Sequence, residues 1–125
     1  MLLHYPSSAK AKEDYWDLPK GHMEENEEER ETVTREVAEE TGLKDLRFLD
    51  GFREVIRYFF RAGGKTVFKT VVFYLAETQT KEVCISHEHI GYQWLPFEDA
   101  FKQLKFQNAK EVLQKANYFP SAKSI

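Results

Sequence analysis

The chain contains one cysteine, Cys84, so an internal disulfide framework is excluded. A lone cysteine is typical of proteins kept in a reducing compartment. No apolar run approaches the roughly 18 residues that a membrane-crossing helix needs. The N-terminus also lacks the basic region and hydrophobic stretch of a secretory signal. We therefore expect a cytoplasmic protein with no membrane partner.

Internal repeats and low-complexity linkers are absent too, and 125 residues suit a single domain, residues 1–125. The net charge of −3 is unevenly distributed. The segment from Glu24 to Glu40 contains nine glutamates and two arginines, which gives a local charge of −7. The remainder of the chain is therefore positive. Such an acidic segment is either a solvated helix or a cation site beside a basic surface that receives anions.

Hydrophobic periodicity predicts strands and helices in one domain. Strands are expected at 2–5, 52–60, 65–77 and 91–95, and helices at about 27–40, 97–104 and 108–116. Ala62-Gly63-Gly64 is a hairpin signal between the two longest strands, and Gly42 is a suitable residue to end the first helix. These elements indicate an α/β or α+β protein with no basic stripe on a helix, and hence no DNA partner.

Three glutamates, Glu36, Glu39 and Glu40, lie within five residues of the first helix. At about 100° per residue they share an arc of roughly 100°, bordering the face that holds Val33 and Val37. Like charges this close repel each other, and hard divalent cations prefer carboxylate oxygens. The glutamates therefore indicate either a cation site or an ordinary solvated helix face.

The spacing around these glutamates decides between the two interpretations. From residue 21 to residue 43 the sequence fits G-x5-E-x7-R-E-U-x-E-E-x-G-U, with U a bulky aliphatic residue. The matching positions are Gly21, Glu27, Arg35, Glu36, Val37, Glu39, Glu40, Gly42 and Leu43. This is the Nudix box at every specified position, so the chain resembles the Nudix hydrolases.

The resemblance implies an α/β/α sandwich with a mixed β-sheet, and hydrolysis of nucleoside diphosphate derivatives with Mg²⁺ or Mn²⁺. It implies that Glu36, Glu39 and Glu40 bind the metal with the Gly21 carbonyl. It also implies that Glu27 and Arg35 form a structural ion pair and that Gly42 ends the helix. The general base that takes the proton from water is either Glu36 or Glu88, and the sequence leaves both open.

Beyond the box, "WDLPKGH", "FKTVVFYLAE" and "SHEHIGYQWL" resemble segments of asymmetrical diadenosine tetraphosphate hydrolases, in the same order. These enzymes release ATP and AMP. The substrate-binding residues that this resemblance implies are Lys20, His22, Lys69, Phe73 and Phe119. Phe73 stands where the family usually has tyrosine and could stack on adenine or belong to the core, and Phe119 could equally anchor the tail. The expected partner is a dinucleoside polyphosphate or another nucleotide.

Other functions stay open beside this one. One is a Nudix pyrophosphohydrolase acting on a nucleoside triphosphate or a 5′-triphosphate RNA end, and another is a nucleotide sensor that does not cut. His87 and His89 would share one face of a strand and could bind Zn²⁺, but no matching Cys or His pair accompanies them.

The chain departs from the family pattern at its beginning. Met1-Leu2-Leu3 already lies inside what resembles the family's second strand, so the first strand is expected to be missing. A sheet without that strand would expose unpaired backbone groups. We therefore expect self-association through an unpaired sheet edge.

Overall fold

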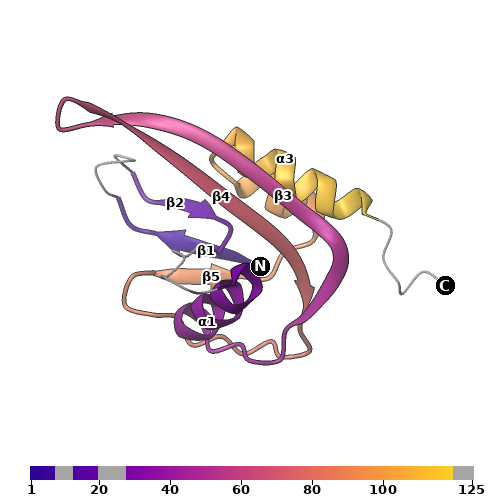
Figure 1. Cartoon of the computed structure of the whole chain (residues 1–125). Coiled ribbons are helices and arrows are strands. Elements are labelled where there is room, and N and C mark those ends of the chain that lie inside the picture. The colour runs from indigo at the N-terminus through magenta and orange to yellow at the C-terminus, as the bar shows by residue number, and fades with distance from the viewer. Residues whose placement is uncertain (8–12, 20–27, 120–125) are drawn as a thin grey trace.

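The structure is a computed structural model, and it describes residues 1–7, 13–19 and 28–119. These residues form five strands and three helices (Figure 1). In chain order they are β1 (Leu2–Tyr5), β2 (Tyr15–Asp17), α1 (Glu29–Thr41), β3 (Arg47–Ala62), β4 (Lys65–Glu77), β5 (Gly91–Gln93), α2 (Phe97–Gln103) and α3 (Gln107–Tyr118). None of the described helices is long and apolar enough to cross a membrane.

The smaller sheet has the strand order β2-β1-β5, with both pairs antiparallel. Leu2 on β1 is almost fully buried and packs with Ala100 and Leu104 at the α2 end and with Ala109 of α3. Partly buried Trp16, Leu18, Leu95 and Leu113 surround this cluster. The C-terminal helices therefore join the small sheet in one hydrophobic core.

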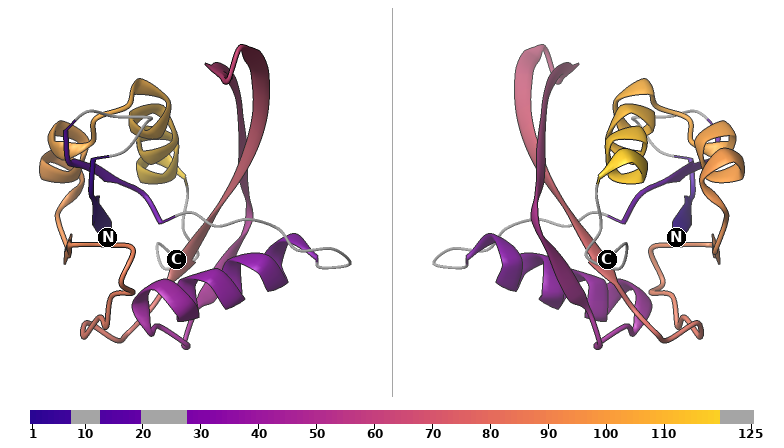
Figure 2. Two further views of the ribbon diagram at one scale, coloured as in Figure 1. Left: turned by 90° about the vertical axis from the view of Figure 1, so that its left-hand side faces the viewer. Right: turned by 90° about the vertical axis from the view of Figure 1, so that its right-hand side faces the viewer.

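The second sheet is the long hairpin of β3 and β4. Its turn is formed by Gly63 and Gly64, with φ values of 58° and 79°. Two-residue hairpin turns of this kind need positive φ at both positions, which glycine adopts without strain. The turn end of the hairpin projects beyond α3 (Figure 2).

Near its base the hairpin lies between two helices. Arg53 of β3 bonds Glu29 of α1, whereas the next residue, Glu54, bonds Lys115 of α3 at 2.7 Å. Successive side chains of a strand point to opposite faces, so α1 and α3 cover opposite faces of the hairpin (Figure 2). This gives a helix–sheet–helix layering in that part of the molecule.

The α/β class, the strand at 2–5, the hairpin at Gly63-Gly64 and the end of the first helix at Gly42 are confirmed. Three features differ from expectation. The structure adds β2, within a stretch expected to be a loop and turn, and begins β3 at Arg47. All pairings among the described strands are antiparallel, in two sheets, instead of one mixed sheet. The turn between β3 and β4 and the loop between β1 and β2 are too short for a parallel crossover.

Candidate functional site

The end of α1 fixes the three box glutamates in the helix's last turns. Gly42 adopts a left-handed conformation, with φ 76°, and its N–H donates to the Ala38 carbonyl at 2.9 Å. A left-handed residue stops the helix while still bonding its last carbonyls. Glu36, Glu39 and Glu40 therefore sit at the carboxyl end of a rigid helix.

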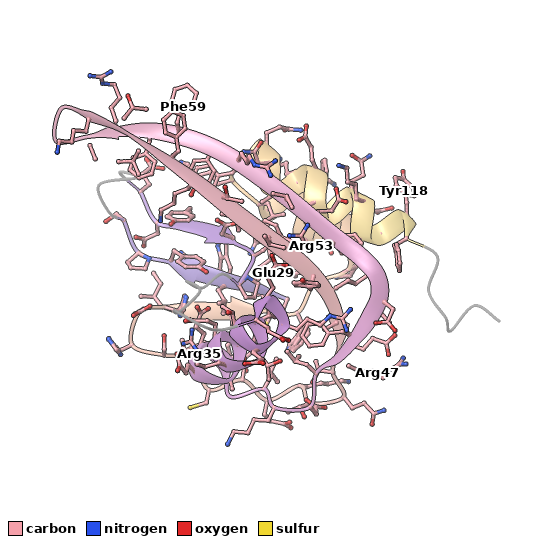
Figure 3. The ribbon with its side chains drawn as sticks, in the orientation of Figure 1. Glu29, Arg35, Arg47, Arg53, Phe59 and Tyr118 are labelled. Carbon is pink, nitrogen blue, oxygen red and sulfur yellow. The ribbon has the colours of Figure 1, made fainter. Side chains whose placement is uncertain are left out.

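Arg35 offsets part of the repulsion between these glutamates. Its Nη1 lies 2.7 Å from Oε1 of Glu36 and 3.2 Å from Oε2 of Glu39. The Glu36 side chain is 19% exposed and that of Glu39 is 59% exposed. Arg35 thus lies among the carboxylates that the sequence assigns to a metal (Figure 3).

Glu40 has a different environment, because its side chain is buried. A loop following β4 runs along the end of α1, where the N–H of Cys84 donates to the Thr41 carbonyl at 2.9 Å and that of Ser86 to the Glu40 carbonyl at 3.0 Å. These bonds bring His89 to Glu40, with Nε2 3.9 Å from Oε2. The loop therefore completes the surroundings of the third box glutamate.

His89 is itself buried, and burial lowers its pKa despite the nearby negative charge of Glu88, which acts in the opposite direction. His87, two residues earlier, is exposed, and residues 87–88 form a turn. The expectation that His87 and His89 share one face of a strand is therefore wrong, because the chain turns between them.

Glu88, the alternative general base, is exposed on this turn. Its N–H donates to the Ser86 hydroxyl at 3.3 Å, and Ser86 is bonded to α1. The loop thus holds Glu88 close in the chain to residues that contact the box helix.

Lys69 and Phe73 both lie on β4 and are half-buried. Lys69 is paired in register with Tyr58, and Phe73 with Glu54, whose carboxylate bonds Lys115 of α3. Cross-strand partners share one face of a sheet, so both residues lie on the face of the hairpin that is turned to α3. The box helix lies on the other face.

Phe119 follows α3 and packs edge-to-face on Phe52, with ring centroids 5.5 Å apart. Its ring also lies 3.4 Å from the position that a Cβ on Gly51 would take. Phe52 is buried, so this contact secures the end of α3 against the hairpin. The stacking role expected for Phe119 stays a prediction.

Four of the site residues expected from the sequence, Lys20, Gly21, His22 and Glu27, lie outside the described residues. Their roles in binding substrate and metal and in pairing with Arg35 stay predictions.

One polar cluster was not expected from the sequence. Arg53 donates two hydrogen bonds to the Glu29 carboxylate, at 2.9 and 2.8 Å, and the Tyr74 hydroxyl donates a third at 2.5 Å (Figure 3). Hydrogen bonds from Arg53 and then from Tyr74 lower the pKa of Glu29 to about 2. The cluster attaches the first turn of α1 to the hairpin, which holds the box helix in place.

The donor chemistry at the end of α1 suits a hard divalent cation, since Glu36, Glu39 and Glu40 supply carboxylate oxygens only. Among the described residues, however, no group of three or more acidic, histidine or cysteine side chains is arranged to hold a metal ion. Arg35 occupies Glu36 and Glu39 instead. A cation bound there would therefore either share these two carboxylates with the guanidinium or replace it as their partner.

Comparisons with known proteins show which family the chain is similar to. Residues 2–116 match the NUDIX domain family. The chain is similar to the asymmetrical bis(5′-nucleosyl)-tetraphosphatase of Mus musculus, with 37% identity over 109 residues that cover 84% of this chain and 71% of the relative. The Caenorhabditis elegans protein of the same name is 32% identical over 108 residues, covering 84% and 75% of the two chains.

A solved structure shows the same fold. The binary complex of the C. elegans Ap4A hydrolase superposes with a TM-score of 0.74 at 30% identity, covering 93% of this chain and 82% of that one. The family match spans nearly the whole described chain, and it includes the helix that carries Glu36, Glu39 and Glu40. The chain therefore belongs to the Nudix family of hydrolases.

Proposed function

We propose that this Nudix pyrophosphohydrolase cleaves diadenosine tetraphosphate into ATP and AMP with Mg²⁺ or Mn²⁺. The observation that carries the proposal is the intact box helix, in a chain 37% identical to an asymmetrical tetraphosphatase over most of its length. The reducing compartment indicated by the lone cysteine supports a cytoplasmic location.

Glu36, Glu39 and Glu40, with the Gly21 carbonyl, are the groups that would hold the divalent cation. When bound, such a cation neutralises phosphate charge and lowers the pKa of water. Arg35 would then leave Glu36 and Glu39 and pair with Glu27. Gly42 ends the helix in a left-handed conformation, which fixes the helix end that carries the three carboxylates.

In the reaction, a water oxygen bonds to a phosphorus atom of the tetraphosphate while the bond from that phosphorus to a bridging oxygen breaks. The four phosphates separate into three on one adenosine and one on the other, giving ATP and AMP. Either Glu36 or Glu88 accepts the proton that water loses. Glu88 gains support from its loop, since Ser86 bonds both Glu88 and the end of α1.

Lys20, His22 and Lys69 would bind phosphates, and Phe73 and Phe119 would stack against adenine. The strongest support for Lys69 is its half-buried place on the face of β4 that also carries Val67 and Val71, because lysine side chains are mostly exposed.

The aromatic residues distinguish a two-nucleotide substrate from a mononucleotide. We expect Phe73→Ala to lower kcat/KM for diadenosine tetraphosphate about tenfold or more, since base–aromatic stacking is worth about 1–3 kcal/mol. The loss for ATP should be smaller. Steady-state kinetics on both nucleotides, with Mg²⁺, makes the measurement.

Phe68→Ala is the matched control, because Phe68 lies on the same strand but is 78% exposed and points to the other face. Equal losses for both nucleotides in Phe73→Ala would contradict a stacking role. Turnover of ATP or of a 5′-triphosphate RNA, without turnover of the tetraphosphate, would favour the other pyrophosphohydrolase activity. Binding without any turnover would indicate a sensor.

A further inference from the structure

His89 lies at the centre of a buried contact between the loop and the box helix. Only 1% of its side chain is exposed, against 9% for Glu40, which faces its Nε2 atom. The other ring nitrogen, Nδ1, lies 3.0 Å from the Ser86 hydroxyl. Tyr5 packs edge-on against the ring, with centroids 4.7 Å apart. The ring is thus fixed on three sides.

The contacts of the two ring nitrogens bear on which of them carries the hydrogen. The Ser86 hydroxyl oxygen already accepts the N–H of Glu88 at 3.3 Å. Among the described residues, the other group within hydrogen-bond distance of the hydroxyl is Nδ1 of His89. A hydroxyl oxygen has two lone pairs, so Ser86 can either donate to Nδ1 or accept a hydrogen from it. The negative carboxylate that faces Nε2 favours the hydrogen on Nε2, and Nδ1 then accepts from Ser86.

A neutral imidazole has one N–H, and on Nε2 this hydrogen would be on the side of the ring that faces the Glu40 carboxylate. At 3.9 Å the two atoms are farther apart than in a hydrogen bond. The N–H dipole still acts on the carboxylate, because little water reaches either side chain.

We propose that His89 is a positioning residue for the divalent-cation site, holding the Glu40 carboxylate through its Nε2 hydrogen while Nδ1 accepts from Ser86. The proposal rests on Glu40 being a metal ligand, as the proposed function has it. Some residues do not bind the metal but orient the side chains that do. Replacing such a residue typically lowers the metal affinity 10–100-fold. We assign this orienting role to His89.

The tautomer can be measured without metal or substrate. Nitrogen NMR of protein labelled with ¹⁵N-histidine distinguishes protonated from unprotonated ring nitrogens, and the four histidines can be assigned from single variants. We expect His89 to show an unprotonated Nδ1 and a protonated Nε2 at neutral pH. Ser86→Ala should broaden the signal or move it towards the other tautomer. A protonated Nδ1 in the unaltered protein would overturn the proposal.

The second arm compares two replacements of the ring. His89→Gln keeps an N–H donor near the position of Nε2, whereas His89→Phe keeps the ring contact with Tyr5 and loses the donor. By titration calorimetry with Mn²⁺ alone, we expect His89→Phe to weaken binding about tenfold or more. His89→Gln should stay within a few-fold of the unaltered protein. His87→Phe, on the same turn but exposed, is the control and should bind Mn²⁺ normally.

Equal weakening in His89→Gln and His89→Phe would mean that the site needs the imidazole as packing, and would contradict positioning through the N–H. Unchanged affinity in His89→Phe would contradict it as well. Glu40→Gln separates this failure from failure of the proposed function. If Glu40→Gln leaves Mn²⁺ affinity intact, Glu40 is no metal ligand and both proposals fail. If Glu40→Gln abolishes binding while His89→Phe does not, only the role of His89 is lost.

Discussion

Glu29 illustrates how a single side chain can fix the orientation of the box helix. Its carboxylate accepts two hydrogen bonds from Arg53 and one from Tyr74, so the pKa falls from the ordinary 4.5 to about 2. A carboxyl group with a lowered pKa in the folded protein contributes stability above its ordinary pKa. That contribution disappears as the pH falls through about 2. The side chain is 35% exposed, so solvent screening keeps the effect small.

We therefore expect Glu29→Gln to lower the urea midpoint of unfolding at pH 7, and the difference from the unaltered protein to shrink as the pH falls from 4.5 towards 2. Urea titrations at several pH values measure this. Glu77→Gln is the control, because the pair of Glu77 with Arg47 is more exposed, at 42% and 64%, and joins two strands that are already paired. A pH-independent difference for Glu29→Gln would show that the carboxylate charge does not stabilise the fold.

For individual residues, the sequence predicts those of the Nudix box but not the residues that contact the box helix in the fold. Glu36, Glu39 and Glu40 follow from fixed spacing along one helix. The partners of Glu29 are 24 and 45 residues away, and no local pattern connects them. The burial of His89 against Glu40 likewise depends on a loop that returns to the helix end through backbone bonds.

Among the elements, α1 ends at a glycine whose left-handed conformation contributes to stability. Gly42 has a φ of 76°, which costs a residue with a Cβ roughly 1–2 kcal/mol. A Cβ at this position would lie 3.5 Å from that of Cys84, an ordinary contact, so the cost is backbone strain and not a clash. We expect Gly42→Ala to lower the free energy of unfolding by about 1–2 kcal/mol, measured by urea denaturation.

Gly42→Asn is the matched variant for this prediction, because asparagine tolerates the left-handed conformation better than alanine. Its loss of stability should be clearly smaller. If the two variants are equally destabilised, contact with the loop at Cys84 and not backbone conformation sets the cost.

The hairpin of β3 and β4 carries exposed rings towards its turn, and two of them lie side by side. Phe59 is 67% exposed and Phe68 is 78% exposed, and their centroids lie 5.9 Å apart on the face away from α3. Exposed apolar rings on a projecting two-stranded sheet favour association. We expect the sedimentation coefficient of the protein to rise with concentration, and the double variant Phe59→Thr/Phe68→Thr to abolish that rise.

Tyr118→Ser serves as the control for that experiment, because Tyr118 is 72% exposed on α3 and lies outside the sheet. It should leave the concentration dependence unchanged. A concentration-independent sedimentation coefficient in the unaltered protein would remove the case for self-association through the sheet.

The elements themselves were largely predictable, because their signals are local. Periodicity located the helices, and Gly63-Gly64 located the hairpin turn. β2 was missed because Trp16 and Asp17 stand next to Pro19 and Gly21, which favour a turn, whereas pairing with β1 decides the outcome. β3 begins early for a similar reason, since Arg47 and Phe48 pair with the end of β4 across an irregularity at Gly51.

For the whole molecule, the box spacing led to the family, and the family match over residues 2–116 confirmed it. The resemblance also implies the helix–sheet–helix layering, but the sequence does not show which face of the hairpin each helix covers, because that depends on contacts between distant residues. That layering has a consequence for function. Lys69 and Phe73 face α3, whereas Glu36, Glu39 and Glu40 belong to α1 on the other side. A substrate that contacts both sets of residues has to reach across the edge of the hairpin.

The most direct test of the proposed activity is to incubate the protein with diadenosine tetraphosphate and Mg²⁺ and to separate the products by chromatography. The Glu40→Gln variant is treated in the same way. We predict ATP and AMP in equal amounts, with turnover in the variant strongly reduced, since the proposed metal ligand has become neutral. Circular dichroism of the variant would confirm that α1 is still formed. Two molecules of ADP as products would contradict the proposed asymmetrical cleavage. Full activity in Glu40→Gln would contradict the proposed role of Glu40.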